Sequence, residues 1–157
     1  MGKIGTFQEA LRDAIIAEDV ALPEFVDGSV VIASGRGQDA QSLENELATS
    51  ISKSSGLSLL LFGREGTTPD VDSDLRMKFS MKIELYVHPY KRDLTLNPSL
   101  RGADELVEAL MVFLHDRSLG DVSGHPYDEI HVTGFSELSD PDFIVFQINI
   151  QRMIDFN

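Results

Sequence analysis

The sequence predicts a single α+β domain over residues 1–157, with helices packed on a mixed, mainly antiparallel sheet. Three observations support this prediction. The length fits one domain, and 42% apolar residues can form a core without metals or disulfides. The apolar residues recur at helical spacing in some stretches and at strand spacing in others. The resulting order, α-β-α-β-β-α-β-β, gathers strands in pairs around a helix rather than alternating βαβ units.

The N-terminal part is expected to contain a helix, a short strand and a second helix. Thr6-Phe7-Gln8-Glu9 matches a capping box, so the first helix should start with Thr6 as N-cap and end near Ala17. A continuously apolar run at residues 30–34 indicates a buried strand. A narrow apolar stripe then predicts a helix over residues 39–54.

The middle of the chain holds the clearest pattern. Gly56 is expected to end the second helix, and a short apolar strand at residues 57–62 precedes a polar loop at 63–74. Over residues 75–88 apolar and polar side chains alternate, which indicates a strand with one buried face. At about 3.3 Å per residue it would span roughly 45 Å, so part of it is expected to extend past the body of the domain.

The C-terminal part is expected to add a helix and two strands. The helix, over residues 102–117, is heavily apolar, with acids near its start and His115 and Arg117 near its end, as the helix dipole favours. Strands follow at 127–135 and 143–154. The turn residues Ser-Asp-Pro-Asp at 139–142 predict an antiparallel hairpin between them.

The stretch "ASGRGQDA" contains Gly35, Gly37 and Ala40, which match the dinucleotide-binding pattern G-x-G-x-x-A. Its place between a strand and a helix fits a phosphate-binding loop. However, the rest of the chain does not continue as a doubly wound sheet, and Asp39 stands where a pyrophosphate would bind. A tight turn with Asp39 as helix cap is therefore favoured, and a nucleotide-binding enzyme that uses this loop remains an alternative.

The polar loop suggests a second ligand. Asp70, Asp72 and Asp74 match the first three ligands of a calcium loop. Leu75 and Met81 occupy the positions at which such a loop needs glycine and a bidentate glutamate. A solvated acidic loop is favoured, and a different or shared divalent-cation site stays open.

No feature of the sequence predicts catalysis, a cofactor or a metal. The chain has no cysteine, which excludes a thiolate nucleophile and a cysteine zinc site. It has neither a nucleophile elbow nor a Walker loop. The histidines lack the spacing of zinc motifs, so structural or surface roles are favoured for all of them: His88, His115, His125 and His131.

The formal net charge of -13 argues against sequence-specific binding to DNA or RNA, because an acidic surface repels phosphate backbones. No run approaches the 18 apolar residues that would predict a membrane span. The N-terminal residues do not form a signal peptide, so secretion is not expected.

With this element order, the chain resembles the tail terminator and minor tail proteins of long-tailed phages. Four segments carry the resemblance: "FQEALRDAI", "VVIASGRGQDAQSLENEL", "LRMKFSMKIELYVHPY", and "ADELVEALMVFLHD" before a final hairpin. The resemblance implies a subunit of a ring, usually a hexamer, that caps the tail tube, stops its polymerisation and joins the head. The implied partners are further copies of the chain, the tail tube protein and the head–tail connector protein, and the implied location is the virion tail.

Ring assembly requires head-to-tail interfaces between copies. The long strand is expected to reach a neighbour by edge pairing, and its basic stripe is expected to meet acids of the neighbour's polar loop. The predicted interface residues are Asp70, Asp72, Asp74, Arg76, Lys78 and Lys82. A small cytoplasmic protein-interaction module is the alternative function.

Overall fold

The computed structural model describes residues 2–33, 40–53, 56–67, 76–88, 101–119 and 129–156. The elements in these ranges are α1 (Lys3–Ala17), β1 (Val30–Ile32), α2 (Ala40–Lys53), β2 (Leu57–Thr67), β3 (Arg76–Val87), α3 (Ala103–Leu114), β4 (His131–Glu137) and β5 (Ile144–Asp155). The predicted α+β class and the predicted order of elements are confirmed.

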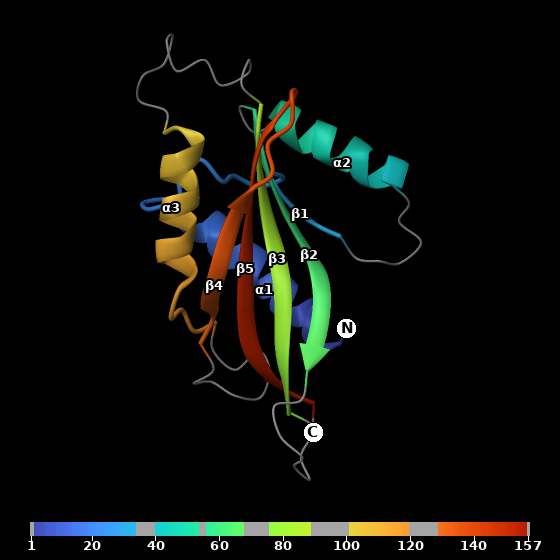
Figure 1. Ribbon diagram of the computed structural model, residues 1–157, viewed down its shortest axis with the longest axis vertical. Helices are drawn as coiled ribbons and strands as arrows, with labels where there is room; N and C mark the ends of the chain where they lie inside the picture. The colour runs from blue at the N-terminus through green and yellow to red at the C-terminus, as the bar shows by residue number, and fades with distance from the viewer. Residues whose placement is uncertain are drawn as a thin grey trace.

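The strands form one mixed sheet in the order β1-β2-β3-β5-β4 (Figure 1). β1 and β2 are parallel and are connected through α2, whereas every other neighbouring pair is antiparallel. The longest ladder joins β3 to β5 and runs from Arg76 opposite Asp155 to Val87 opposite Ile144. The predicted antiparallel hairpin of the last two strands is therefore present as β4 and β5.

β3 lies in the centre of the sheet, and from Lys78 to Val87 both of its edges are paired. β5 pairs with it over its whole length, and β2 pairs with it as far as Lys78. The expectation that part of this strand extends past the domain is wrong. Near its start, Phe79 is buried and packs edge-to-face on Phe7 of α1, with ring centroids 5.8 Å apart.

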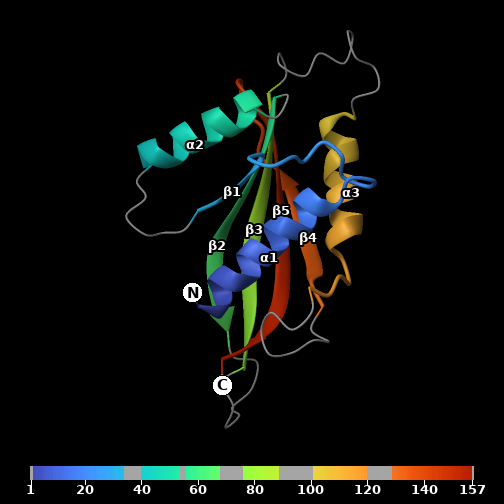
Figure 2. The same cartoon turned by 180° about the vertical axis from the view of Figure 1, so that it is seen from behind.

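The two faces of the sheet are covered differently. α1 and α3 lie on one face, where α1 crosses the strands diagonally (Figure 2). The core between them consists mainly of Phe7, Leu11, Ile15, Leu59, Leu61, Phe79, Met81, Ile83, Leu85, Leu106, Leu110, Phe146, Ile148, Ile150 and Ile154. Burial of this apolar surface is the main force that holds the helices on the sheet.

α2 packs on the opposite face, over the β1–β2 side of the sheet (Figure 1). Ser58 of β2 donates a hydrogen bond to Ser50 Oγ of α2 at 2.9 Å, and both side chains are buried. Ile51 and Leu60 are buried at the same contact. The remainder of this face, along β3 and β5, is not covered by a described helix, and we call it the open face.

α1 begins earlier than predicted because Thr6 does not act as its cap. Gly2 occupies the N-cap position with an extended conformation, and the helix starts at Lys3. The Thr6 hydroxyl instead donates to the Gly2 carbonyl four residues before it, at 3.1 Å. This back-bonding is an alternative use of a threonine hydroxyl, so the predicted capping box is wrong.

Two other boundaries reflect local backbone conformation. Gly56 has φ +86° and donates its N–H to Ile51 O, which fits its predicted role at the end of α2. β2 continues to Thr67, past the predicted end at residue 62, because pairing with β3 resumes after a bulge. α3 ends at Leu114, since Asp116 adopts φ +61°, a left-handed conformation that cannot continue the helix.

Candidate functional site

Two of the predicted sites lie outside the residues that the structure describes. These are the glycine loop with Gly35 and Gly37, and the acidic loop with Asp70, Asp72 and Asp74. The structure does describe the elements that flank each loop, namely β1 and α2 around the first and β2 and β3 around the second. Of the predicted interface, the structure describes the basic stripe on β3, which consists of Arg76, Lys78 and Lys82.

Arg76, Lys78 and Lys82 all lie on the open face of β3, because residues two apart in a strand point the same way. Lys78 and Lys82 are exposed and lie about 13 Å apart along the strand. In the described ranges, neither lysine has a carboxylate within ion-pair distance. Arg76 is half-buried, and its Nε is buried without a hydrogen-bond partner there. The stripe thus presents two solvated positive charges, at Lys78 and Lys82.

A bulge in β2 shapes the surface beside Lys82. The register of β2 shifts between Phe62 and Glu65, and Gly63 within this bulge has φ +75°. A Cβ at Gly63 would lie 3.4 Å from the Lys82 Cγ, so the aliphatic part of Lys82 lies directly over the glycine. Glycine suits this position because other residues rarely adopt such a φ. The bulge thus supports the stem of Lys82.

Glu84 is the acidic residue on the open face of β3 that lies nearest in sequence to Lys82, and its carboxylate already has two hydrogen-bond partners. Glu84 accepts a hydrogen bond from the Tyr86 hydroxyl and another from Gln147 Nε2 at 2.9 Å. Desolvation of the half-buried phenol, and then its hydrogen bond to Glu84, raise the pKa of Tyr86 above its ordinary value. Glu84 therefore serves the packing of β3 against β5 and leaves the two lysines unneutralised.

Among the described residues, the sheet has two edges on opposite sides that no neighbouring strand covers. β4 pairs with β5 alone, and its side chains are exposed or half-buried, with Phe135 54% exposed. On the other side β1 covers β2 only as far as Leu61, so residues 62–67 of β2 have β3 along one edge and no described strand along the other. Exposed edges of this kind are templates for pairing with another strand.

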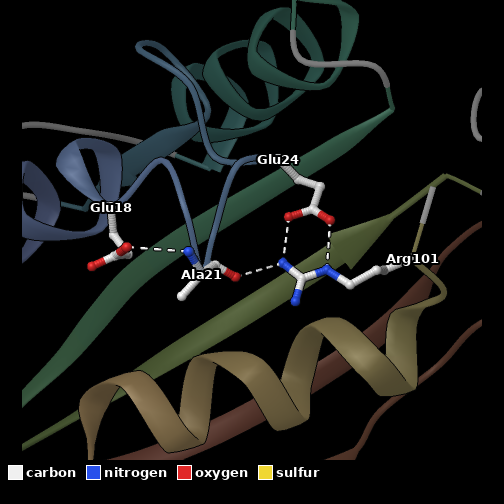
Figure 3. A network of polar contacts seen from close by, with 4 residues as sticks. All are labelled: Glu18, Ala21, Glu24 and Arg101. Atoms are coloured by element: carbon white, nitrogen blue, oxygen red, sulfur yellow. Dashed lines mark hydrogen bonds and ion pairs between the residues drawn. The ribbon is translucent and has the colours of Figure 1, made fainter. Parts of the chain in front are cut away.

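The start of α3 is attached to the segment after α1 by a polar joint (Figure 3). Arg101 donates to both carboxylate oxygens of Glu24 at 2.6 Å and to Ala21 O at 2.7 Å. Glu18 in turn accepts from the Ala21 N–H at 3.1 Å. The hydrogen bond to Glu24 raises the pKa of the Arg101 guanidinium above its ordinary value. This joint orders the helices over the core and is distant in the fold from the basic stripe.

Two surface depressions accompany these features. One of about 510 Å³ lies between β1 and α2 and is lined by residues that include Arg12, Glu46 and Ser50. The other, of about 590 Å³, lies beside the Arg101 joint and is lined partly by Val20 and Val112 of the exposed surface. The described lining residues of the two depressions include no histidine. Among these residues there is therefore no pair of a nucleophile and a histidine general base.

Sequence reasoning missed one cluster, formed by His115, Asp116 and His131. One ligand atom from each lies within 4.8 Å of the others. The two histidines are 16 positions apart and belong to different elements, so no spacing rule for a single helix or loop could have paired them. Only the packing of the end of α3 on the start of β4 brings them together.

The sequence matches no model of a known protein family, and no curated protein matches it. None of the described helices is long and apolar enough to cross a membrane.

Proposed function

We propose that the protein is a structural assembly subunit, which forms a homo-oligomeric ring that caps a phage tail tube and provides the surface for joining the head. The sequence resemblance to tail terminator proteins suggests this role. The α+β fold agrees with the fold that the resemblance implies. The single observation that carries the proposal is the pair of uncovered sheet edges on opposite sides of the domain.

The strand directions make these two edges compatible. β4 is antiparallel to β5, β5 to β3 and β3 to β2, so β4 runs opposite to β2. When copies stand side by side in the same orientation, β4 of one copy meets residues 62–67 of the next as an antiparallel pair. The contact uses different surfaces on the two partners, and such a contact forms a ring when its rotation closes. β4 and β2 therefore replace β3 as the strands that reach a neighbour.

The basic stripe gives this contact a charge preference. Lys78 and Lys82 are solvated cations on a protein with 13 bases and 26 acids. Another copy of the same chain therefore offers an excess of carboxylates, among them the predicted partners Asp70, Asp72 and Asp74. Complementary charges of this kind favour one orientation of encounter and weaken as salt is added.

The remaining roles follow from the same proposal. The tail tube protein and the head–tail connector protein are the expected partners of the two rims of the ring. The net charge of -13 suits a conduit for DNA, since an acidic wall does not adhere to the passing phosphates. Assembly is expected in the host cytoplasm and the final location in the virion tail.

The first test is the oligomeric state of the full chain. Light scattering over a concentration series, followed by negative-stain imaging, should give rings of about six subunits, either alone or after addition of tail tubes. Added protein should also halt the polymerisation of tube subunits. A chain that stays monomeric at every concentration and neither binds nor stops tubes would overturn the proposal and favour a small interaction module.

The second test reverses single charges. Lys82→Glu and Lys78→Glu should each weaken ring formation and flatten its dependence on salt. Arg12→Glu is the matched control, because it changes the net charge equally from the surface of α1, where Arg12 faces Asp13 at 3.2 Å. Equal effects from all three substitutions would remove the stripe from the interface while leaving edge pairing to be tested separately.

A further inference from the structure

His115, Asp116 and His131 meet at the junction between the end of α3 and the start of β4. The Asp116 Oδ1 lies 3.5 Å from His115 Nε2 and 3.7 Å from His131 Nδ1. The three side chains are between half and two-thirds exposed. One carboxylate oxygen thus lies between two imidazole nitrogens at an accessible position.

The backbone around this cluster holds the two segments in a fixed relation. The Asp116 N–H donates to Ile130 O at 2.8 Å, and the Ile130 N–H donates to Arg117 O at 2.9 Å. Ile130 and Leu114 beside these bonds are fully buried. The cluster therefore projects from a rigid part of the fold, which reduces the entropy lost when its side chains are ordered by a ligand.

The conformation of Asp116 is the unusual element of this arrangement. Its φ of +61° makes it the only non-glycine residue with positive φ in the described ranges. Aspartate tolerates this left-handed conformation, but it is less stable than the helical one. The conformation points to a constraint at this position, as is common at ligand-binding sites.

The local electrostatics favour a cation. The C-terminal end of α3 carries partial negative charge, and Asp116 adds a carboxylate. The basic side chain that follows in sequence, Arg117, is directed elsewhere: its Nε donates to Phe113 O at 2.9 Å, and its guanidinium lies 3.8 Å from the centre of the Phe113 ring. Among the described residues, the only basic side chains within ion-pair distance of the Asp116 carboxylate are those of His115 and His131.

The donor set determines which cation fits. Two imidazole nitrogens and one carboxylate oxygen suit borderline divalent transition metals rather than Mg²⁺ or Ca²⁺, which prefer oxygen. Around tetrahedral Zn²⁺, with bonds of about 2.0–2.1 Å, ligand atoms lie roughly 3.3 Å apart. The two separations from Asp116 Oδ1, 3.5 and 3.7 Å, are already close to this value.

We propose that His115, Asp116 and His131 form a surface binding site for a divalent transition metal such as Zn²⁺, with water completing the coordination. The ion would tie the end of α3 to the first residue of the uncovered strand β4. This proposal does not depend on ring assembly, because all three ligands come from one chain.

The hydrogen bond of His115 predicts a specific consequence of binding. The Val132 N–H donates to His115 Nδ1 at 3.2 Å, so the proton of the neutral imidazole is on Nε2. A metal at Nε2 displaces this proton, which moves to Nδ1, and the Val132 hydrogen bond is lost. The loss limits affinity, so we expect a site that exchanges its metal, with a change at the Val132 amide that accompanies binding.

The test is calorimetric titration of the full, metal-free chain with Zn²⁺, with Mg²⁺ as the comparison ion. We expect one Zn²⁺ per chain, no binding of Mg²⁺ and a rise in Tm with Zn²⁺. His131→Ala and Asp116→Asn should each abolish binding, and asparagine preserves the fold because it tolerates a left-handed φ. His88→Ala, which removes a histidine outside the cluster, should bind as the unaltered chain does.

Nuclear magnetic resonance supplies a second readout. The Val132 amide signal should shift as Zn²⁺ is added to the unaltered chain and stay in place in Asp116→Asn. Zn²⁺ binding that persists in both cluster variants, or the absence of Zn²⁺ binding by the folded unaltered chain, would overturn the proposal. Neither result bears on whether the chain forms rings.

Discussion

The covered and open faces of the same sheet differ sharply in what their side chains contact. On the covered face, Ile83 and Leu85 of β3 are fully buried beneath the helices. On the open face of the same strand, Lys82 is exposed, and Glu84 is held by side-chain hydrogen bonds. Adjacent residues of one strand thus serve separate purposes: one face contributes stability, whereas the other is available for contacts with another molecule.

The largest loss of stability should come from a cavity on the covered face. Ile83→Ala removes buried methyl and methylene groups from a side chain that is fully enclosed, so unfolding should become easier by about 2–5 kcal/mol. Chemical denaturation monitored by circular dichroism gives this free energy. A loss below about 1 kcal/mol would mean that the covered face is loosely packed.

The next largest effect should come from the polar joint above the covered face. Arg101→Ala leaves Glu24, which is nearly buried, without its bidentate partner, and a loss of about 1.5–3 kcal/mol in unfolding free energy is expected. Arg12→Ala breaks an exposed pair with Asp13 and should change stability by less than about 0.5 kcal/mol. Equal losses in the two variants would show that the joint does not stabilise the helices.

The contact between Tyr86 and Glu84 on the open face should make the free energy of unfolding depend on pH in the alkaline range. Its pKa is raised in the folded state, so the folded chain retains the phenolic proton more strongly than the unfolded chain. The resulting stability is complete below the unfolded pKa of about 10 and is lost as pH rises above it, by at most about 1.4 kcal/mol per pH unit. Solvent screening of this half-exposed ring reduces the pKa shift and therefore the total free energy that is lost.

The measurement is the free energy of unfolding between pH 9 and pH 11, within roughly one unit of the ordinary tyrosine pKa. Tyr86→Phe should lose less stability over this interval than the unaltered chain, because it has no phenol to ionise. Identical pH profiles would mean that the contact with Glu84 is not maintained in solution.

The smallest effect on stability should come from the basic stripe. Lys82→Ala removes an exposed charge with no described ion pair, so its unfolding free energy should stay within about 0.5 kcal/mol of the original. The same substitution should weaken ring formation if the stripe contacts a neighbour. A large loss of stability would instead indicate that packing of the Lys82 stem over Gly63 supports the β2 bulge.

Much of the fold could be predicted because local patterns reflect which side of each element is buried. Alternation over residues 75–88 correctly identified the buried face of β3, with Phe79, Met81, Ile83 and Leu85 inside. The order of elements and the final hairpin followed from similar signals. The start of α1 was less predictable, because the Thr6 hydroxyl bonds back to the Gly2 carbonyl instead of capping the helix.

The candidate site was less predictable, because position within a sheet depends on partners that are distant in sequence. The length of β3 suggested a free strand, yet β2 and β5 cover both of its edges. β4, which showed no special pattern, became the exposed edge. The predicted interface thus remains a prediction at Arg76, Lys78 and Lys82, while the acids Asp70, Asp72 and Asp74 lie outside the described residues.

The sequence by itself determined the element types, their order and the buried face of β3, because these depend on the spacing of apolar residues within about a dozen positions. The tertiary structure decided the strand order, the two uncovered edges and the meeting of His115 with His131. Such contacts form between segments far apart in the chain, and their geometry depends on how buried surfaces pack together.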